Sequence, residues 1–133
     1  MRKKGVVLVL LAILTLGLLL AGCSGRTLEP GILSGTVTIG PIWPVERPGE
    51  SPPIPCEVYE ARKVMIYDKK GSRLIKQVDL DCNGNYRVEL NPGVYTVDIN
   101  RIGIDFSKDV PKKIEIRPGE TIELDIDIDT GIR

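Results

Sequence analysis

The sequence predicts an all-β fold, a seven-stranded antiparallel β-sandwich with Greek-key connections, from two observations. Apolar residues recur at every second position in short runs, which is the period of a strand with one buried face. Turn residues, chiefly Gly, Pro, Asn and Asp, separate the runs, and no run has the 3.6-residue period of an amphipathic helix. Short alternating strands with frequent turns are typical of two antiparallel sheets packed face to face.

The predicted strands follow one another from Ser34 to the end of the chain. They lie at 36–39, 63–67, 73–80, 86–90, 95–99, 114–117 and 122–129. The segment 68–71 predicts a hairpin loop with Gly71 in the left-handed position, and 91–93 and 117–120 predict tight turns. Tyr95 follows one of these turns closely enough to place its hydroxyl on it, as a tyrosine corner, although a core tyrosine with an exposed tip is the alternative.

The first 22 residues predict an export signal. Arg2, Lys3 and Lys4 precede an apolar run over 6–20, and small residues lead from there to Cys23. A basic start, an apolar middle and a small-residue exit are the pattern of a secretory signal peptide. The apolar run is shorter than the about 20 residues that cross a bilayer, which argues against the alternative of an uncleaved transmembrane anchor.

The residues Leu20-Ala21-Gly22-Cys23 resemble the lipobox of bacterial lipoproteins. In that family the cysteine thiol receives a diacylglycerol, the peptide before it is removed, and the new amino terminus is often acylated. The resemblance implies an extracytoplasmic protein, anchored to the cell membrane or the outer membrane through lipid on Cys23, because two or more acyl chains hold a protein stably on a bilayer. We therefore expect a signal peptide at 1–22, a lipidated flexible tether at 23–33 and the sandwich domain at 34–133.

Cys56 and Cys82 remain once Cys23 is assigned to lipid. An even pair of cysteines in an oxidising compartment predicts a Cys56–Cys82 disulfide. Closing a loop of this length contributes about 3 kcal/mol of stability in the chain-entropy model. Two free buried thiols, or a metal site short of ligands, are the alternatives.

Charge and composition exclude several classes of function. Without Arg2, Lys3 and Lys4, 15 of the 18 basic residues remain against 18 acidic ones, a net charge of −3, which does not suit a nucleic-acid binder. The chain has no histidine, so a Ser-His-Asp triad, a Cys-His pair and a His-ligated zinc are ruled out. It also lacks the P-loop and dinucleotide-binding motifs. We expect no cofactor, no bound metal and no enzymatic activity.

Four stretches occur in a fixed order along the predicted strands. They are Gly35-Thr36-Val37, the strand and turn at 64–68, D-x-x-G-x-Y at 81–86 and L-x-P-G-x-Y-x-V at 90–97. This order resembles carboxypeptidase regulatory-like domains, which share the transthyretin-like (prealbumin-like) sandwich. The resemblance implies a structural or binding accessory without an active site. Transthyretin-like hydrolases rely on histidines, so their activity does not carry over to this chain.

The proline-rich segment 41–55 departs from that family and is the candidate binding loop, with Trp43 and Arg47 as its candidate contact residues. Proline fixes φ and so reduces the entropy lost when a loop is ordered. A tryptophan on a stiff exposed loop suits an interface anchor. In the alternative, Trp43 folds back and caps one end of the sandwich. An envelope protein or a polysaccharide is the expected partner.

Two acidic stretches are weaker candidates for a cation site. The segment 79–85 begins like a calcium loop but has Leu90 where a bidentate Glu is needed, and it predicts a β-turn at Asn83-Gly84 instead. Asp125, Asp127 and Asp129 share one face of the last strand, either as cation ligands or, more commonly, as a solvated face.

The function predicted from all these features is that of a membrane-anchored lipoprotein that displays a non-catalytic binding or structural module at the cell envelope. A metal- or solute-binding lipoprotein and a carboxylate-based hydrolase are the alternatives.

Overall fold

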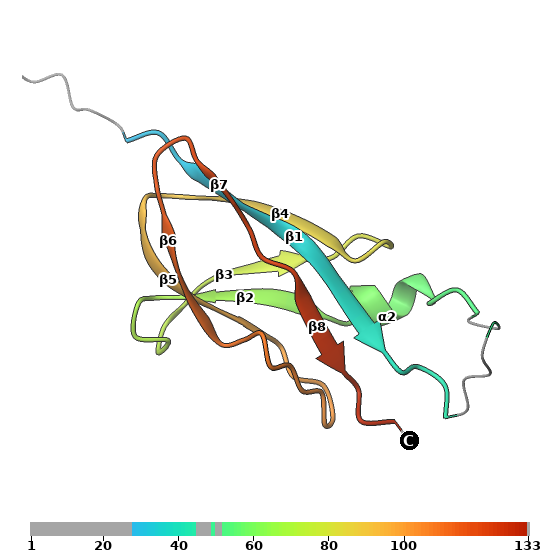
Figure 1. Ribbon diagram of the computed structural model, residues 1–133. Coiled ribbons are helices and arrows are strands. Elements are labelled where there is room, and N and C mark those ends of the chain that lie inside the picture. The colour runs from blue at the N-terminus through green and yellow to red at the C-terminus, as the bar shows by residue number, and fades with distance from the viewer. Residues whose placement is uncertain (1–27, 45–48, 50–51, 133) are drawn as a thin grey trace, which may run out of the picture.

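A computed structural model describes residues 28–44, 49 and 52–132, and it confirms the predicted β-sandwich (Figure 1). Two sheets pack face to face with the core between them. Within the described residues the elements are β1 (Gly31–Gly40), α2 (Cys56–Glu60), β2 (Lys63–Tyr67), β3 (Leu74–Asp79), β4 (Asn85–Leu90), β5 (Gly93–Ile99), β6 (Lys112–Ile116), β7 (Thr121–Glu123) and β8 (Ile126–Asp129).

The two sheets differ in strand direction. In the first sheet, β1 pairs with β4 on one side and with β7 and then β8 on the other, while the second sheet has the order β3-β2-β5-β6. The second sheet is antiparallel throughout, and so is the pairing of β1 with β4. The antiparallel prediction is wrong for β7 and β8, which run parallel to β1. A two-residue alternation is the same in either direction, so the sequence pattern could not distinguish the two arrangements.

The last predicted strand, 122–129, is interrupted in the structure at Leu124 and Asp125, so the seven predicted strands become eight. At the break, the Tyr86 hydroxyl donates to the Leu124 carbonyl at 2.5 Å, and the Asp125 carboxylate accepts the Thr36 backbone N–H at 2.9 Å. A side chain from the last run thus bonds to β1 where the ladder between the main chains is interrupted.

The first strand begins earlier than expected. Gly31 already pairs with Leu90, and Leu33 is fully buried. The last three residues of the expected tether at 23–33 therefore belong to the sandwich. The expected signal peptide and Cys23 lie outside the described residues.

The short helix α2 was not predicted. Its five residues hold one turn, in which the Ala61 N–H donates to the Glu57 carbonyl at 3.0 Å. One turn is too short to show a helical period in the sequence. Among the described residues, no helix is long and apolar enough to cross a membrane.

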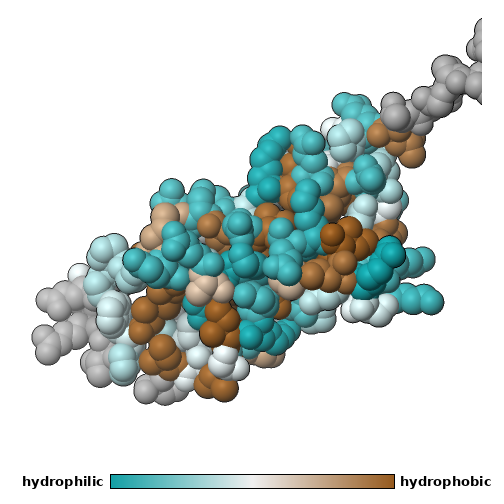
Figure 2. All heavy atoms as spheres, turned by 180° about the vertical axis from the view of Figure 1, so that it is seen from behind, coloured by the Kyte–Doolittle hydropathy of each residue, from teal (hydrophilic) through white to brown (hydrophobic). Residues whose placement is uncertain are grey.

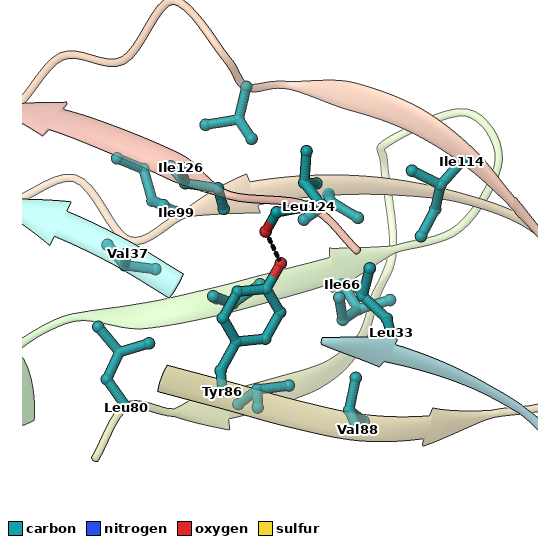
Figure 3. Packing of buried hydrophobic residues seen from close by; sticks show 14 of the residues in the cluster. Leu33, Val37, Ile66, Leu80, Tyr86, Val88, Ile99, Ile114, Leu124 and Ile126 are labelled. Carbon is teal, nitrogen blue, oxygen red and sulfur yellow. Dashed lines mark hydrogen bonds between the residues drawn. The ribbon is translucent and has the colours of Figure 1, made fainter. Parts of the chain in front are cut away.

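The core consists of the alternating apolar residues of both sheets, as predicted (Figure 3). Val64 and Ile66 of β2 and Val97 of β5 are fully buried. Tyr86 points from β4 into this core, and its hydroxyl reaches Leu124 (Figure 3). Tyr95 forms the predicted tyrosine corner, since its hydroxyl donates to the Asn91 carbonyl at 2.6 Å.

We expect the Tyr86 hydroxyl to make the protein sensitive to alkali. Burial, and secondarily the charge of Asp125, raises the pKa of Tyr86 well above its ordinary value. The tyrosine ionises near pH 10 in the unfolded chain but keeps its proton in the folded chain. This group therefore leaves the free energy of unfolding unchanged below pH 10 and lowers it by about 1.4 kcal/mol per pH unit above.

Urea unfolding of the wild type and Tyr86→Phe between pH 7 and 11.5 tests this expectation. At pH 7 the variant should be about 1–3 kcal/mol less stable, because the buried Leu124 carbonyl loses its donor. Above pH 10 the difference should shrink. A difference between Tyr86→Phe and the wild type that does not change with pH would contradict this expectation.

Candidate binding surface

One end of the sandwich carries a group of exposed apolar side chains, which we call the apolar end: Trp43, Ile102, Ile104 and Phe106. Trp43 follows β1, and the other three lie in the loop between β5 and β6. Ile104 is 73% exposed and Phe106 60% exposed. Both segments lie at the end of the molecule opposite the start of β1 (Figure 1). Hydrophobic surface is visible at this end of the molecule in Figure 2.

A hollow of about 400 Å³ opens at the apolar end, between α2, the β5–β6 loop and the segment after β8. Its walls are largely apolar. It is lined by Ile42, Val58, Arg62, residues 102–105 and residues 130–132.

A nearly buried ion pair forms the polar part of this hollow. The Arg62 guanidinium donates to both carboxylate oxygens of Asp105, at 2.9 and 3.1 Å. The side chains of Arg62 and Asp105 are only 11% and 2% exposed. Arg62 also donates to the Val58 carbonyl at 3.0 Å, so this single side chain joins α2 to the β5–β6 loop.

The main chain beneath the exposed side chains is fixed by hydrogen bonds. Phe106 and Asp129 exchange two backbone hydrogen bonds, at 2.8 and 2.7 Å. The Thr130 N–H donates to the Gly40 carbonyl at 3.1 Å, and the Thr130 hydroxyl donates to the Pro41 carbonyl. The loop and the segments after β1 and β8 therefore hold one another in place.

Of the two candidate contact residues, the structure describes Trp43, which is 42% exposed. Its neighbour Ile42 is partly buried and packs against the core. Arg47 lies outside the described residues.

Sequence reasoning missed the other apolar residues of this end. Ile102, Ile104 and Phe106 alternate with polar or small residues, which is a strand-like signal. Here the alternation is inverted, because the apolar side chains face solvent and Asp105 faces the protein.

The predicted disulfide between Cys56 and Cys82 is present in the structure and links the start of α2 to the turn between β3 and β4. It also bears on the metal alternative. Among the residues that the structure describes, the only group of possible metal ligands is Cys56, Glu60 and Cys82. Because the two sulfur atoms are bonded to each other, neither is available as a thiolate.

Replacing both cysteines, as Cys56→Ser with Cys82→Ser, should lower the free energy of unfolding by about 3 kcal/mol, since the unfolded chain regains the freedom of the open loop. Urea titration without reductant measures this. The wild type with excess reductant is the matched control and should lose a similar amount. Equal stability of all three samples would show that the bond does not constrain the unfolded chain.

The acidic stretches serve the fold. The Asp81 carboxylate accepts the N–H groups of Asn83 and Asn85 at 2.9 Å, and Gly84 adopts a φ of +81°, as the predicted β-turn requires. In the last run, the Asp127 carboxylate accepts the Thr38 hydroxyl at 2.9 Å. The Asp129 carboxylate accepts the Gly131 N–H at 2.8 Å, and Asp125 bonds to β1 as described above. These carboxylates have separate hydrogen-bond partners.

Comparisons with known proteins do not place the chain in a family. No family model matches it, and no curated protein is significantly similar. The minor pilin GBS52 of the Gram-positive pathogen Streptococcus agalactiae is 14% identical with a TM-score of 0.49, over 77% of this chain and 45% of the pilin chain. A DUF3823 family protein from Parabacteroides merdae is 15% identical with a TM-score of 0.42, over 76% of this chain and 46% of its own. This chain thus spans less than half the length of either structure, and both likenesses are too distant to inform function.

Proposed function

We propose that this protein is an exported lipoprotein, anchored through Cys23, whose non-catalytic sandwich binds a protein of the cell envelope with its apolar end. The observation that carries the proposal is the group of exposed side chains formed by Trp43, Ile102, Ile104 and Phe106. Large apolar and aromatic side chains at the surface become favourable when a partner covers them.

The rigidity of the apolar end favours binding. Phe106 is fixed by its main-chain pairing with Asp129, and the Arg62–Asp105 ion pair fixes the residue between Ile104 and Phe106. A surface that is already ordered loses little entropy when it binds. A tryptophan such as Trp43 commonly supplies much of the affinity at protein interfaces. The aliphatic side chains of Ile102 and Ile104 cannot hydrogen-bond sugar hydroxyls, which favours a protein over a polysaccharide as the partner.

The position of the expected anchor would leave the apolar end free to bind a partner. From Cys23 to Gly31 the chain can span at most about 28 Å, so the lipid would hold the start of β1 near the membrane. The apolar end lies at the other end of β1 (Figure 1) and would be accessible to neighbouring envelope proteins.

Photo-crosslinking in the native membrane tests the proposal. A photoreactive amino acid at Ile104 or Phe106 should give a discrete, protease-sensitive adduct. The matched control is Val94, which is 36% exposed at the start of β5 and lies outside the apolar end. Ile104→Asp, placed in the chain that carries the probe at Phe106, should abolish the adduct.

Adducts of equal strength from all three positions, or from none, would contradict a binding role for the apolar end. An adduct that resists protease and is removed by glycosidases would assign the partner as a polysaccharide instead.

A further inference from the structure

The strand β4 has a free edge that is regular along its length. It lies at one side of its sheet and pairs only with β1, without a register shift. The Val37 N–H donates to the Gly84 carbonyl at 2.8 Å at the start of this antiparallel ladder. Because hydrogen-bonded residues alternate along such a ladder, Tyr86, Val88 and Leu90 direct their main-chain groups toward β1.

The intervening residues direct their main-chain groups away from β1. The Asn85 carbonyl accepts the Asp81 N–H at 3.0 Å, and the Asn85 N–H donates to the Asp81 carboxylate at 2.9 Å. The N–H and C=O groups of Arg87 and Glu89 face the open side. Their side chains are exposed, and within the described part of the chain they form no ion pair.

The other sheet edges are protected against pairing, as is usual in natural sandwiches. On β3, the register shifts opposite Ile66 and Tyr67, and Lys76 lies opposite the buried Ile66 on the inward face. The edge strand β6 has Pro111 before it and Pro118 after it.

The edge formed by β7 and β8 is interrupted at Leu124 and Asp125 and is covered further along. The Asp127 N–H donates to the Asp109 carboxylate at 2.8 Å, and Phe106 pairs with Asp129. Among the described strands, β4 is therefore the edge that lacks such protection.

From this difference we propose that β4 pairs with β4 of a second copy of the chain, in an antiparallel dimer centred on Val88. In this register, Arg87 lies opposite Glu89 of the second copy, and Glu89 lies opposite its Arg87. The outward main-chain groups of both residues then meet their counterparts, which gives four backbone hydrogen bonds and two ion pairs. Because Arg87 and Glu89 lie on either side of Val88 and carry opposite charges, β4 is complementary to a second copy of itself in this register.

The dimer is compatible with attachment of both copies to one membrane. Gly31 lies opposite Leu90, two residues from the proposed twofold axis at Val88. Strand spacing and rise then place the two Gly31 residues about 20 Å apart, within reach of two tethers on one surface. The proposal does not depend on the lipid anchor or on the partner of the apolar end, because its contacts lie on β4 alone.

Sedimentation of the purified full chain, in detergent matched to the solvent density, tests the dimer. The wild type should sediment as a dimer, and Arg87→Glu or Glu89→Arg alone should raise the dissociation constant at least about tenfold, because each change places like charges opposite each other twice. Mixing the two variants should restore a heterodimer, since every charge then meets its opposite. The double variant Arg87→Glu with Glu89→Arg should form a homodimer again.

A wild type that stays monomeric up to about 0.5 mM, where even weak specific pairs associate, would overturn the proposal. So would dimers that persist unchanged in both single variants, or a mixture that fails to form the heterodimer. A co-purifying foreign segment on β4, displaced by neither variant, would assign the edge to another protein and would equally reject self-pairing.

Discussion

Replacing Asp105 with alanine should lower the free energy of unfolding by about 3–5 kcal/mol, the largest effect expected from a single side chain in this protein. The Arg62 side chain is only 11% exposed in the wild type, and the change removes the carboxylate that pairs with its guanidinium. Water cannot solvate this charge fully in place, so the structure must either keep it unpaired or open the contact between α2 and the β5–β6 loop. Urea unfolding at pH 7 measures the loss, and binding through the apolar end should weaken with it.

The matched control removes both charges, as Arg62→Met with Asp105→Leu. Apolar residues of similar volume fill the space without a desolvated charge, so the double variant should lie within about 1–2 kcal/mol of the wild type. If Asp105→Ala were as stable as the double variant, the ion pair would have no role in holding the loop.

Gly35→Ala should destabilise the sandwich by about 3 kcal/mol or more, since the added methyl group meets main chain that cannot rotate away. A Cβ at Gly35 would lie 2.0 Å from the Leu124 carbonyl oxygen and 3.1 Å from Cε1 of Tyr86. This is the place where the last run breaks and where the Tyr86 hydroxyl bonds to Leu124. The variant should therefore also lose part of the parallel pairing between β1 and β8.

Gly40→Ala is the matched control, because it changes a glycine of the same strand that has no atom within 4 Å of an added Cβ. It should change stability by less than about 1 kcal/mol. Hydrogen exchange of β8 amides in Gly35→Ala reports the local opening, and slow exchange equal to that of the wild type would contradict the packing described here.

Much of the fold could be predicted from the sequence because its strands have one buried and one exposed face. The alternation of Val64 and Ile66 and the turn at Asn83-Gly84 each have a local physical cause, so they are visible in the sequence. Strand direction has no such cause. The parallel pairing of β8 with β1, and the break at Asp125, follow from contacts between residues about 90 positions apart.

The candidate site shows the same division. The pairing of Cys56 with Cys82 could be predicted because an oxidising compartment favours a disulfide and the assignment of Cys23 to lipid left these two cysteines. The exposure of Ile104 and Phe106 could not be predicted, because alternating apolar residues normally indicate buried side chains. Here the ion pair with Arg62 turns Asp105 inward, so its two apolar neighbours face solvent. Only the folded arrangement shows that these residues lie at the same end as Trp43.

The proposed function requires that lipid on Cys23 holds this sandwich at a membrane. The most direct test is the intact mass of the protein purified from its native membrane, together with that of Cys23→Ser. We expect a wild-type mass equal to residues 23–133 plus acyl chains, and a Cys23→Ser protein that carries no lipid. A wild-type protein that retains residues 1–22 and carries no lipid would contradict the claim.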